Sequence, residues 1–134
     1  MKKKIIEGNI YKTRNIQKSQ KEGGQDGWIL GWFAPVPFKT EEFEIKLGDH
    51  KKGKKKEITA FNNKAKTLLI LIQGKISTNF YNKKGIFIKK VILKNPGDFN
   101  FYNPGIAHNW IFLEKSRTLT IRWPSIENDQ KELK

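Results

Sequence analysis

The chain carries few side chains that could do acid–base or metal chemistry. It has two histidines, His50 and His108, and no cysteine. An imidazole can act as a general base, a hydrogen-bond donor or a metal ligand near neutral pH. The lack of cysteine excludes thiol catalysis, disulfide scaffolds, Cys-ligated zinc and iron–sulfur clusters. A metal ion would therefore depend on His, Asp, Glu or backbone oxygen ligands.

His108 follows a turn and begins an alternating segment. Residues 103–105 read Asn-Pro-Gly, a turn sequence in which proline presets φ and glycine allows a positive φ. In the strand expected to follow, His108, Trp110 and Phe112 share one face, because side chains alternate along a strand. A barrel would direct such a face into a pocket lined by aromatic side chains. His108 is then the candidate catalytic residue, as hydrogen-bond donor or general base, and Trp110 and Phe112 form an apolar, ligand-binding wall.

The alternative role for His108 is structural, satisfying buried polar neighbours by hydrogen bonding. Asn62 and Thr67 are the partners that this alternative predicts, and both are also candidate ligand-binding residues. Arg122 is a further candidate, because it faces opposite to its two apolar neighbours. It is either a solvent-exposed side chain or an anchor for an anionic ligand, and the sequence leaves both possibilities open.

His50 is the remaining candidate ligand-binding residue. It could approach His108 in space, with Glu44, Glu57 or Asp49 as a third donor, and two histidines with a carboxylate form a legitimate facial metal site. The spacing does not require this arrangement, so we assign no metal ligand. The other interpretation of His50 is a turn residue beside a lysine-rich loop.

Short apolar runs between turn residues indicate the strands that position these side chains. The alternation over residues 42–47 predicts that Phe43, Ile45 and Leu47 face the core, that the charged residues between them face away, and that the strand ends at Gly48. Strands are predicted over residues 28–34, 42–47, 57–61, 67–73, 75–81, 86–93, 99–102, 107–113 and 117–123.

Positive charge dominates the composition, with a formal net charge of +14 and a pI near 10.0. Every residue of Lys51–Lys56 except Gly53 is lysine, which predicts a solvated turn because ammonium groups resist burial. A basic chain can bind nucleic acid or another polyanion. Almost all of this charge is Lys, however, whereas Arg provides the bidentate contacts typical of nucleic-acid recognition. Polyanion binding is therefore the less favoured alternative.

The 134 residues suit one domain with one core. Strand signals without a long helical stripe predict an all-β sandwich or barrel. We divide the chain into a polar basic arm over 1–26, a barrel over 27–125, and a polar tail over 126–134 that is expected to fray. The start lacks a signal-peptide core and no segment resembles a membrane span, so we expect a cytoplasmic protein.

The string from Gly97 to Trp110 resembles the second conserved motif of the cupin superfamily. Gly97, Gly105 and His108 occupy its Gly, Gly and His positions, whereas Pro104 falls one residue late and Phe112 replaces a final Asn. The segment 68–75 is similar to the strand and glycine that close the first cupin motif. The resemblance implies a double-stranded β-helix, the jelly-roll barrel of cupins, over roughly residues 42–123.

A further likeness is to small, single-domain, mostly uncharacterised cupins. These have a Gly-Trp near the start, a Lys-x-Gly-x-His stretch and an Arg-Trp-Pro-Ser ending. This chain has Gly27-Trp28, the segment 46–50 with sequence Lys-Leu-Gly-Asp-His, and the segment 122–125 with sequence Arg-Trp-Pro-Ser. The family resemblance and the expected exposed strand edges both imply a homodimer.

Metal-dependent cupins use two His and a Glu from the first motif and a His from the second. Here the Glu position falls on Thr67, and the first-motif His positions fall on Ala60 or Phe61 and on Asn62 or Asn63. We therefore predict a small-molecule-binding cupin of unknown ligand without the usual metal site or any required cofactor. The alternatives are a metal-dependent dioxygenase or isomerase using His108 and His50, with a divalent metal, and a protein that binds polyanions through its lysines.

Overall fold

The structure is a computed structural model that describes Glu7 and residues 28–32 and 38–133. Apart from Glu7, the predicted arm over residues 1–26 lies outside the described residues, as do residues 33–37. The described ranges contain strands and no helix, and therefore no helix that is long and apolar enough to cross a membrane. The strands are β1 (Trp28–Gly31), β2 (Phe38–Lys39), β3 (Glu44–His50), β4 (Ala60–Asn62), β5 (Lys66–Gln73), β6 (Ile76–Tyr81), β7 (Phe87–Leu93), β8 (Phe99–Tyr102), β9 (Ala107–Phe112), β10 (Ser116–Trp123) and β11 (Gln130–Glu132).

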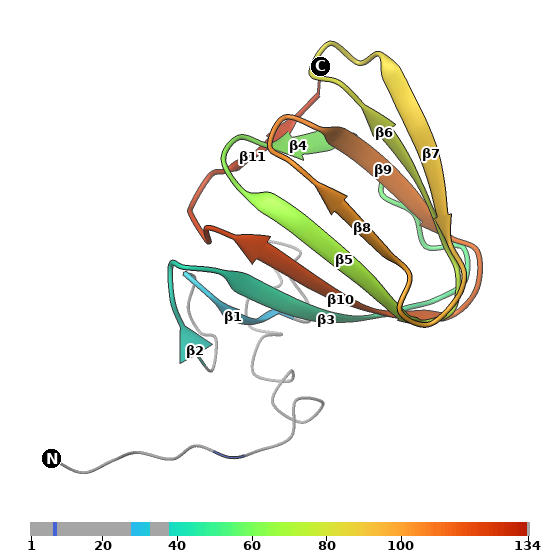
Figure 1. Cartoon of the computed structure of the whole chain (residues 1–134), viewed down its shortest axis with the longest axis horizontal. Coiled ribbons are helices and arrows are strands. Elements are labelled where there is room, and N and C mark those ends of the chain that lie inside the picture. Colours follow the sequence, from blue (N-terminus) through green and yellow to red (C-terminus); the bar gives the residue numbers. More distant parts are fainter. Residues whose placement is uncertain (1–6, 8–27, 33–37, 134) are drawn as a thin grey trace, which may run out of the picture.

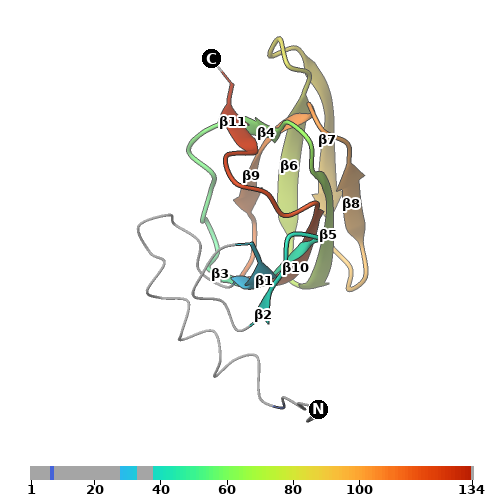
Figure 2. The same cartoon turned by 90° about the vertical axis from the view of Figure 1, so that its left-hand side faces the viewer.

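The strands form two sheets that face each other across the interior of a flattened barrel (Figures 1 and 2). One sheet has the order β2-β1-β3-β10-β5-β8, and the other has the order β11-β4-β9-β6-β7. The apolar end of the interior is a cluster of Leu71, Ile76, Leu93 and Phe112. The expected all-β barrel is confirmed, and its interior holds a small apolar core beside a polar region.

The predicted facing of β3 was wrong for Phe43 and for the charged residues, whereas Leu47 is buried as predicted, at 7% exposure. Glu44 is buried at 6% exposure, Phe43 is exposed at 37%, and both Lys46 and His50 line the interior pocket. The strand also continues beyond Gly48, because seven residues pair with β10 in unbroken register. The charged residues Glu44 and Lys46 face the interior between the two sheets instead of solvent. Alternation shows that two faces differ without showing which face the second sheet covers.

The C-terminal segment does not end in a frayed tail. β11 pairs antiparallel with β4 and extends the five-stranded sheet. The carboxylate of Asp129 accepts hydrogen bonds from the backbone N–H groups of Lys64 and Ala65, at 2.8 and 3.0 Å. These bonds anchor the segment before β11 to the turn before β5, so three residues of the polar segment 126–134 become part of the sheet.

The lysine-rich segment Lys51–Lys56 is only partly a solvated turn. Residues 51–55 are exposed as predicted, whereas Lys56 is half-buried and lines the interior pocket. The backbone of this segment is bonded to β9, since Phe112 N–H donates to the Lys54 carbonyl at 2.8 Å and Lys56 N–H donates to the Trp110 carbonyl at 2.9 Å. The prediction that the whole run is solvated therefore fails at its last residue.

Candidate functional site

A cavity of about 210 Å³ opens between the two sheets. Five of the predicted site residues lie in its wall, namely His50, His108, Trp110, Phe112 and Arg122. Two others, Asn62 and Thr67, are buried but are not part of the lining. The residues that line the cavity without having been predicted include Trp28, Lys46, Lys56, Thr78, Asn100, Tyr102, Thr118, Thr120 and Gln130.

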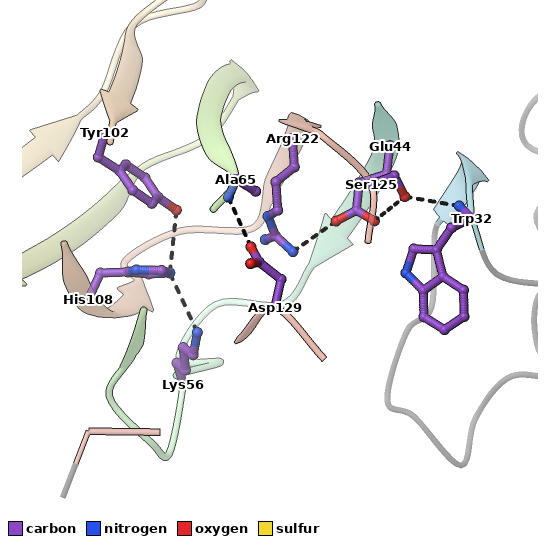
Figure 3. A network of polar contacts seen from close by, with 9 residues as sticks. All are labelled: Trp32, Glu44, Lys56, Ala65, Tyr102, His108, Arg122, Ser125 and Asp129. Atoms are coloured by element: carbon purple, nitrogen blue, oxygen red, sulfur yellow. Dashed lines mark hydrogen bonds and ion pairs between the residues drawn. The ribbon is translucent and has the colours of Figure 1, made fainter. Parts of the chain in front are cut away.

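His108 lies on β9 beside Ala60 of β4 and Phe80 of β6. Its Nε2 atom is 3.3 Å from the hydroxyl oxygen of Tyr102 and 3.5 Å from Nζ of Lys56 (Figure 3). Burial, and after it the charges of Lys56 and Arg122, lower the pKa of His108 to about 3. The ring is therefore neutral at pH 7, and Nε2 is placed to accept a hydrogen bond. Its polar partners are Tyr102 and Lys56 rather than the expected Asn62 and Thr67.

Tyr102 was not anticipated from the sequence. It ends β8, and Thr67 of β5 is its register partner. Burial raises the pKa of the Tyr102 hydroxyl, although the Arg122 charge and the Thr67 side chain oppose this. Tyr102 therefore keeps its proton and serves as a donor toward His108. Alternation along residues 99–102, just before the Asn-Pro-Gly turn, was the signal that could have identified it.

Lys56 extends from the loop into the cavity beside His108. Burial is the main cause that lowers the pKa of Lys56 to about 8, and the charges of Arg122 and Lys46 add to it. Lys46 comes from β3 and Arg122 from β10, so the three cations reach the cavity from separate segments. No carboxylate lines the cavity among the residues that the structure describes.

His50 and His108 line the same cavity but contact different partners. The His50 ring stacks on Phe112, with centroids 4.0 Å apart and planes 10° apart. Its Nε2 atom is 3.2 Å from the hydroxyl oxygen of Thr118. Gly48 leaves the space that this ring occupies. The Lys-x-Gly-x-His stretch thus places two polar side chains on one face with a glycine between them.

Arg122 belongs to a buried network at one side of the cavity (Figure 3). Its guanidinium is 3.2 Å from a carboxylate oxygen of Glu44, and the other Glu44 oxygen accepts a 2.9 Å hydrogen bond from the Ser125 hydroxyl. Ser125 in turn accepts the backbone N–H of Trp32 at 2.9 Å. Burial raises the pKa of Glu44 despite these partners, of which Arg122 opposes the shift most. The open question about Arg122 is resolved, since its side chain faces the interior rather than solvent.

Trp28 connects this network to the other cations. Lys46 Nζ and the Arg122 guanidinium lie 5.7 and 5.3 Å from the centroid of the Trp28 ring. An indole face attracts cations, so Trp28 helps to hold both side chains at the cavity wall. The Trp28 side chain is itself buried, at 3% exposure.

The residues at the metal positions do not fit a metal ion. Thr67 and Asn62 occupy first-motif positions, and Ala60 lies beside His108. Within residues 28–32 and 38–133, no group of three or more His, Cys, Asp or Glu side chains is arranged to hold a metal. Glu44, the carboxylate that enters the interior, is paired with Arg122 instead.

Comparison with known proteins identifies the fold. No protein-family model matches the sequence, and no curated protein matches it either. Among solved structures, the chain is similar to a cupin superfamily protein from Desulfitobacterium hafniense, with a TM-score of 0.53 and 18% identity over 63% of this chain and 70% of that one. KdgF from Halomonas sp. matches with a TM-score of 0.51 and 17% identity, over 63% and 72%.

A third match is an uncharacterised protein with a double-stranded β-helix domain from Klebsiella pneumoniae. Its TM-score is 0.54 at 16% identity, over 71% of this chain and 77% of that one. At these identities the matches establish the fold alone. Together with the two facing antiparallel sheets, they show that this chain folds as a cupin double-stranded β-helix.

Proposed function

We propose that this protein binds a small organic anion in the cavity between its sheets. The observation that carries the proposal is the charge of the wall. Lys46, Lys56 and Arg122 contribute cations to it and no described residue of the lining contributes a carboxylate, since Glu44, which pairs with Arg122, lies outside the lining. Charges interact more strongly inside a protein than in water. Burial is the main cause of the lowered pKa of Lys56, and an anion would relieve the repulsion from Arg122 and Lys46 that adds to it.

The size of the cavity limits the ligand. A volume of about 210 Å³ corresponds to about seven water molecules at about 30 Å³ each. Such a space suits a short carboxylate or a small phosphate ester. Trp110 and Phe112 supply an apolar wall for the carbon atoms, whereas Asn100, Thr118 and Thr120 supply hydrogen-bonding groups.

Lactate is a suitable first probe because it is small, anionic and able to form hydrogen bonds. We expect wild-type protein to bind lactate in calorimetry and to unfold at a higher temperature in its presence than in chloride of equal ionic strength. Lys56→Gln removes one cation from the wall and should weaken binding at least tenfold, since hydrogen bonds to charged groups contribute about 1.5–3 kcal/mol. Lys54→Gln removes an exposed charge from the same loop and should bind like wild type.

Absence of lactate binding to wild-type protein, or equal loss in the two lysine variants, would contradict the proposal. The polyanion alternative predicts a different pattern. RNA or heparin binding through the exposed lysines of residues 51–55 should fall steeply with salt and survive Lys56→Gln. The metalloenzyme alternative predicts metal in protein purified without a His tag, lost in His108→Ala. We expect no stoichiometric metal in either form, by plasma mass spectrometry.

A further inference from the structure

We propose that the Lys56 amine forms a reversible imine with a small anionic carbonyl compound in the cavity, and that 2-oxo acids are the class that fits. The inference rests on the proposed anion-binding function and adds a covalent step to it. Three observations support it: the fixed position of Lys56, its buried surroundings beside His108 and Tyr102, and the neighbouring cations that would hold a carboxylate.

The backbone at Lys56 is held firmly. Gly53 N–H donates to the Phe112 carbonyl at 2.7 Å, and Phe112 N–H donates to the Lys54 carbonyl at 2.8 Å. Lys56 N–H donates to the Trp110 carbonyl at 2.9 Å. The loop thereby follows β9, the strand that carries His108. A reactive amine needs such support, because a misplacement of about 1 Å costs about two orders of magnitude in rate.

The surroundings of Lys56 suit a nucleophilic amine. Only the unprotonated amine attacks a carbonyl, and a lysine activated by burial and by other cations is a recognised form of this nucleophile. Nζ faces His108 at 3.5 Å, and the charges of Arg122 and Lys46 act on it. With its pKa lowered to about 8, about one Lys56 in ten is unprotonated at pH 7. For an ordinary lysine the fraction is about one in three thousand.

The reaction balances without a co-reactant. The nitrogen lone pair attacks the carbonyl carbon, the C=O π electrons move to oxygen, and that oxygen later leaves as water. Its two protons come from the Lys56 ammonium group, so ammonium and ketone give iminium and water with no change of charge. Lys56 releases its first proton to solvent, because His108, with a pKa of about 3, is too weak a base to hold it. The Tyr102 hydroxyl, which lies 3.3 Å from His108 Nε2, can donate a proton to the departing oxygen, and solvent replaces that proton.

The cations define the rest of the substrate. Arg122, which is paired with Glu44, and Lys46 line the same cavity as Lys56, and their charges add to burial in lowering its pKa. A 2-oxo acid has its carboxylate directly beside the carbonyl carbon, so the carboxylate can contact these cations while the carbonyl meets the amine. Pyruvate and acids of similar length fit the volume of about 210 Å³.

The test is reductive trapping of the full chain with pyruvate and cyanoborohydride, followed by peptide mapping. Hydride reduces the iminium to a stable secondary amine at the residue that formed it. We expect Lys56 to be labelled at least tenfold faster than Lys54 and Lys55, exposed lysines of the same loop. Lactate should protect Lys56 alone. Tyr102→Phe, which removes a hydroxyl donor from the cavity and keeps the ring, should slow the labelling of Lys56 at least tenfold.

Whether Lys56 forms the imine is decided with wild-type protein alone, so the test does not depend on the folding of any variant. If lactate binds but Lys56 is labelled no faster than Lys54, the imine is overturned and anion binding stands. If Lys56 is labelled selectively although lactate does not bind, the imine stands and the proposed anion site is wrong as described. Failure of both measurements overturns both proposals.

Discussion

Gly48 lies directly beside the imidazole of His50, which follows it by two positions on the same face of β3. A Cβ atom at Gly48 would overlap Nε2 of His50 and would also crowd the Thr118 hydroxyl. The glycine therefore determines where the His50 ring can sit, stacked on Phe112.

Gly48→Ala should displace His50 and lower the free energy of unfolding by about 1–3 kcal/mol, the usual cost of overpacking. Urea unfolding measures this change. In a His50→Ala background the same substitution should cost at least about 1 kcal/mol less, because the overlapping ring is gone. Equal costs in the two backgrounds would show that Gly48 serves another purpose.

Protonation of His108 should oppose folding in acid. Its pKa falls from the ordinary 6.5 to about 3 in the folded protein, because of burial and the nearby Lys56 and Arg122. The unfolded chain therefore binds a proton below about pH 6.5 that the folded chain resists until about pH 3. The stabilisation is complete above pH 6.5 and is lost as pH falls, at up to about 1.4 kcal/mol per pH unit.

Denaturant unfolding from pH 7 to 4 checks this dependence. His108→Gln should flatten the slope relative to wild type, whereas Lys54→Gln, which changes an exposed lysine, should leave it unchanged. Both variants keep the groups that act on His108. These are Tyr102 and Lys56, which contact its ring, and Arg122, whose charge lowers its pKa. An unchanged slope in His108→Gln would mean that His108 titrates alike in both states.

Arg122 and Glu44 should depend on each other for stability. Their side chains are 18% and 8% exposed, and their charged groups are 3.2 Å apart. Arg122→Met should cost about 3–5 kcal/mol, because it leaves the Glu44 carboxylate buried without its cation. Glu44→Gln in addition should restore more than about 1 kcal/mol of that loss. A double-mutant cycle by urea unfolding measures the coupling, and strict additivity of the two changes would contradict it.

We propose that a second copy of the chain covers an apolar patch on the outer face of the six-stranded sheet. Ile72 of β5 and Phe99 and Phe101 of β8 are 40%, 62% and 48% exposed, and Phe101 contacts Trp123 at a centroid distance of 6.0 Å. In a chain of net charge +14, these uncharged side chains offer an apolar surface to a second copy, and the exposed Lys66, the register partner of Trp123, lies next to it on β5.

Phe101→Asp should therefore convert a dimer into a monomer, measured by light scattering after size exclusion. Ile88→Asp is the matched control, since Ile88 is an exposed apolar residue on β7 at 52% exposure and should leave the dimer intact. Salt should favour the wild-type dimer by screening the net charge. A wild-type monomer at high salt would refute the proposal.

Much of the fold could be predicted from the sequence, because it depends on local patterns. The turn residues at 103–105 and the alternation after them place His108, Trp110 and Phe112 on one face, and all three line the cavity. The resemblance of residues 97–110 to a cupin motif led to the same barrel that the solved structures show. Turn chemistry and period-two alternation act between near neighbours, so they can be recognised without knowing the rest of the molecule.

The tertiary structure decided the parts that depend on how the two sheets face each other. Charged and apolar residues alternate along β3 in the same way whichever face points inward. The sequence therefore could not show that Glu44 and Lys46 point inward. Lys56 looked like its exposed neighbours until the hydrogen bonds to β9 turned it into the cavity. Its pairing with His108 joins residues far apart in the chain, and only the packing of the loop against the barrel brings them together.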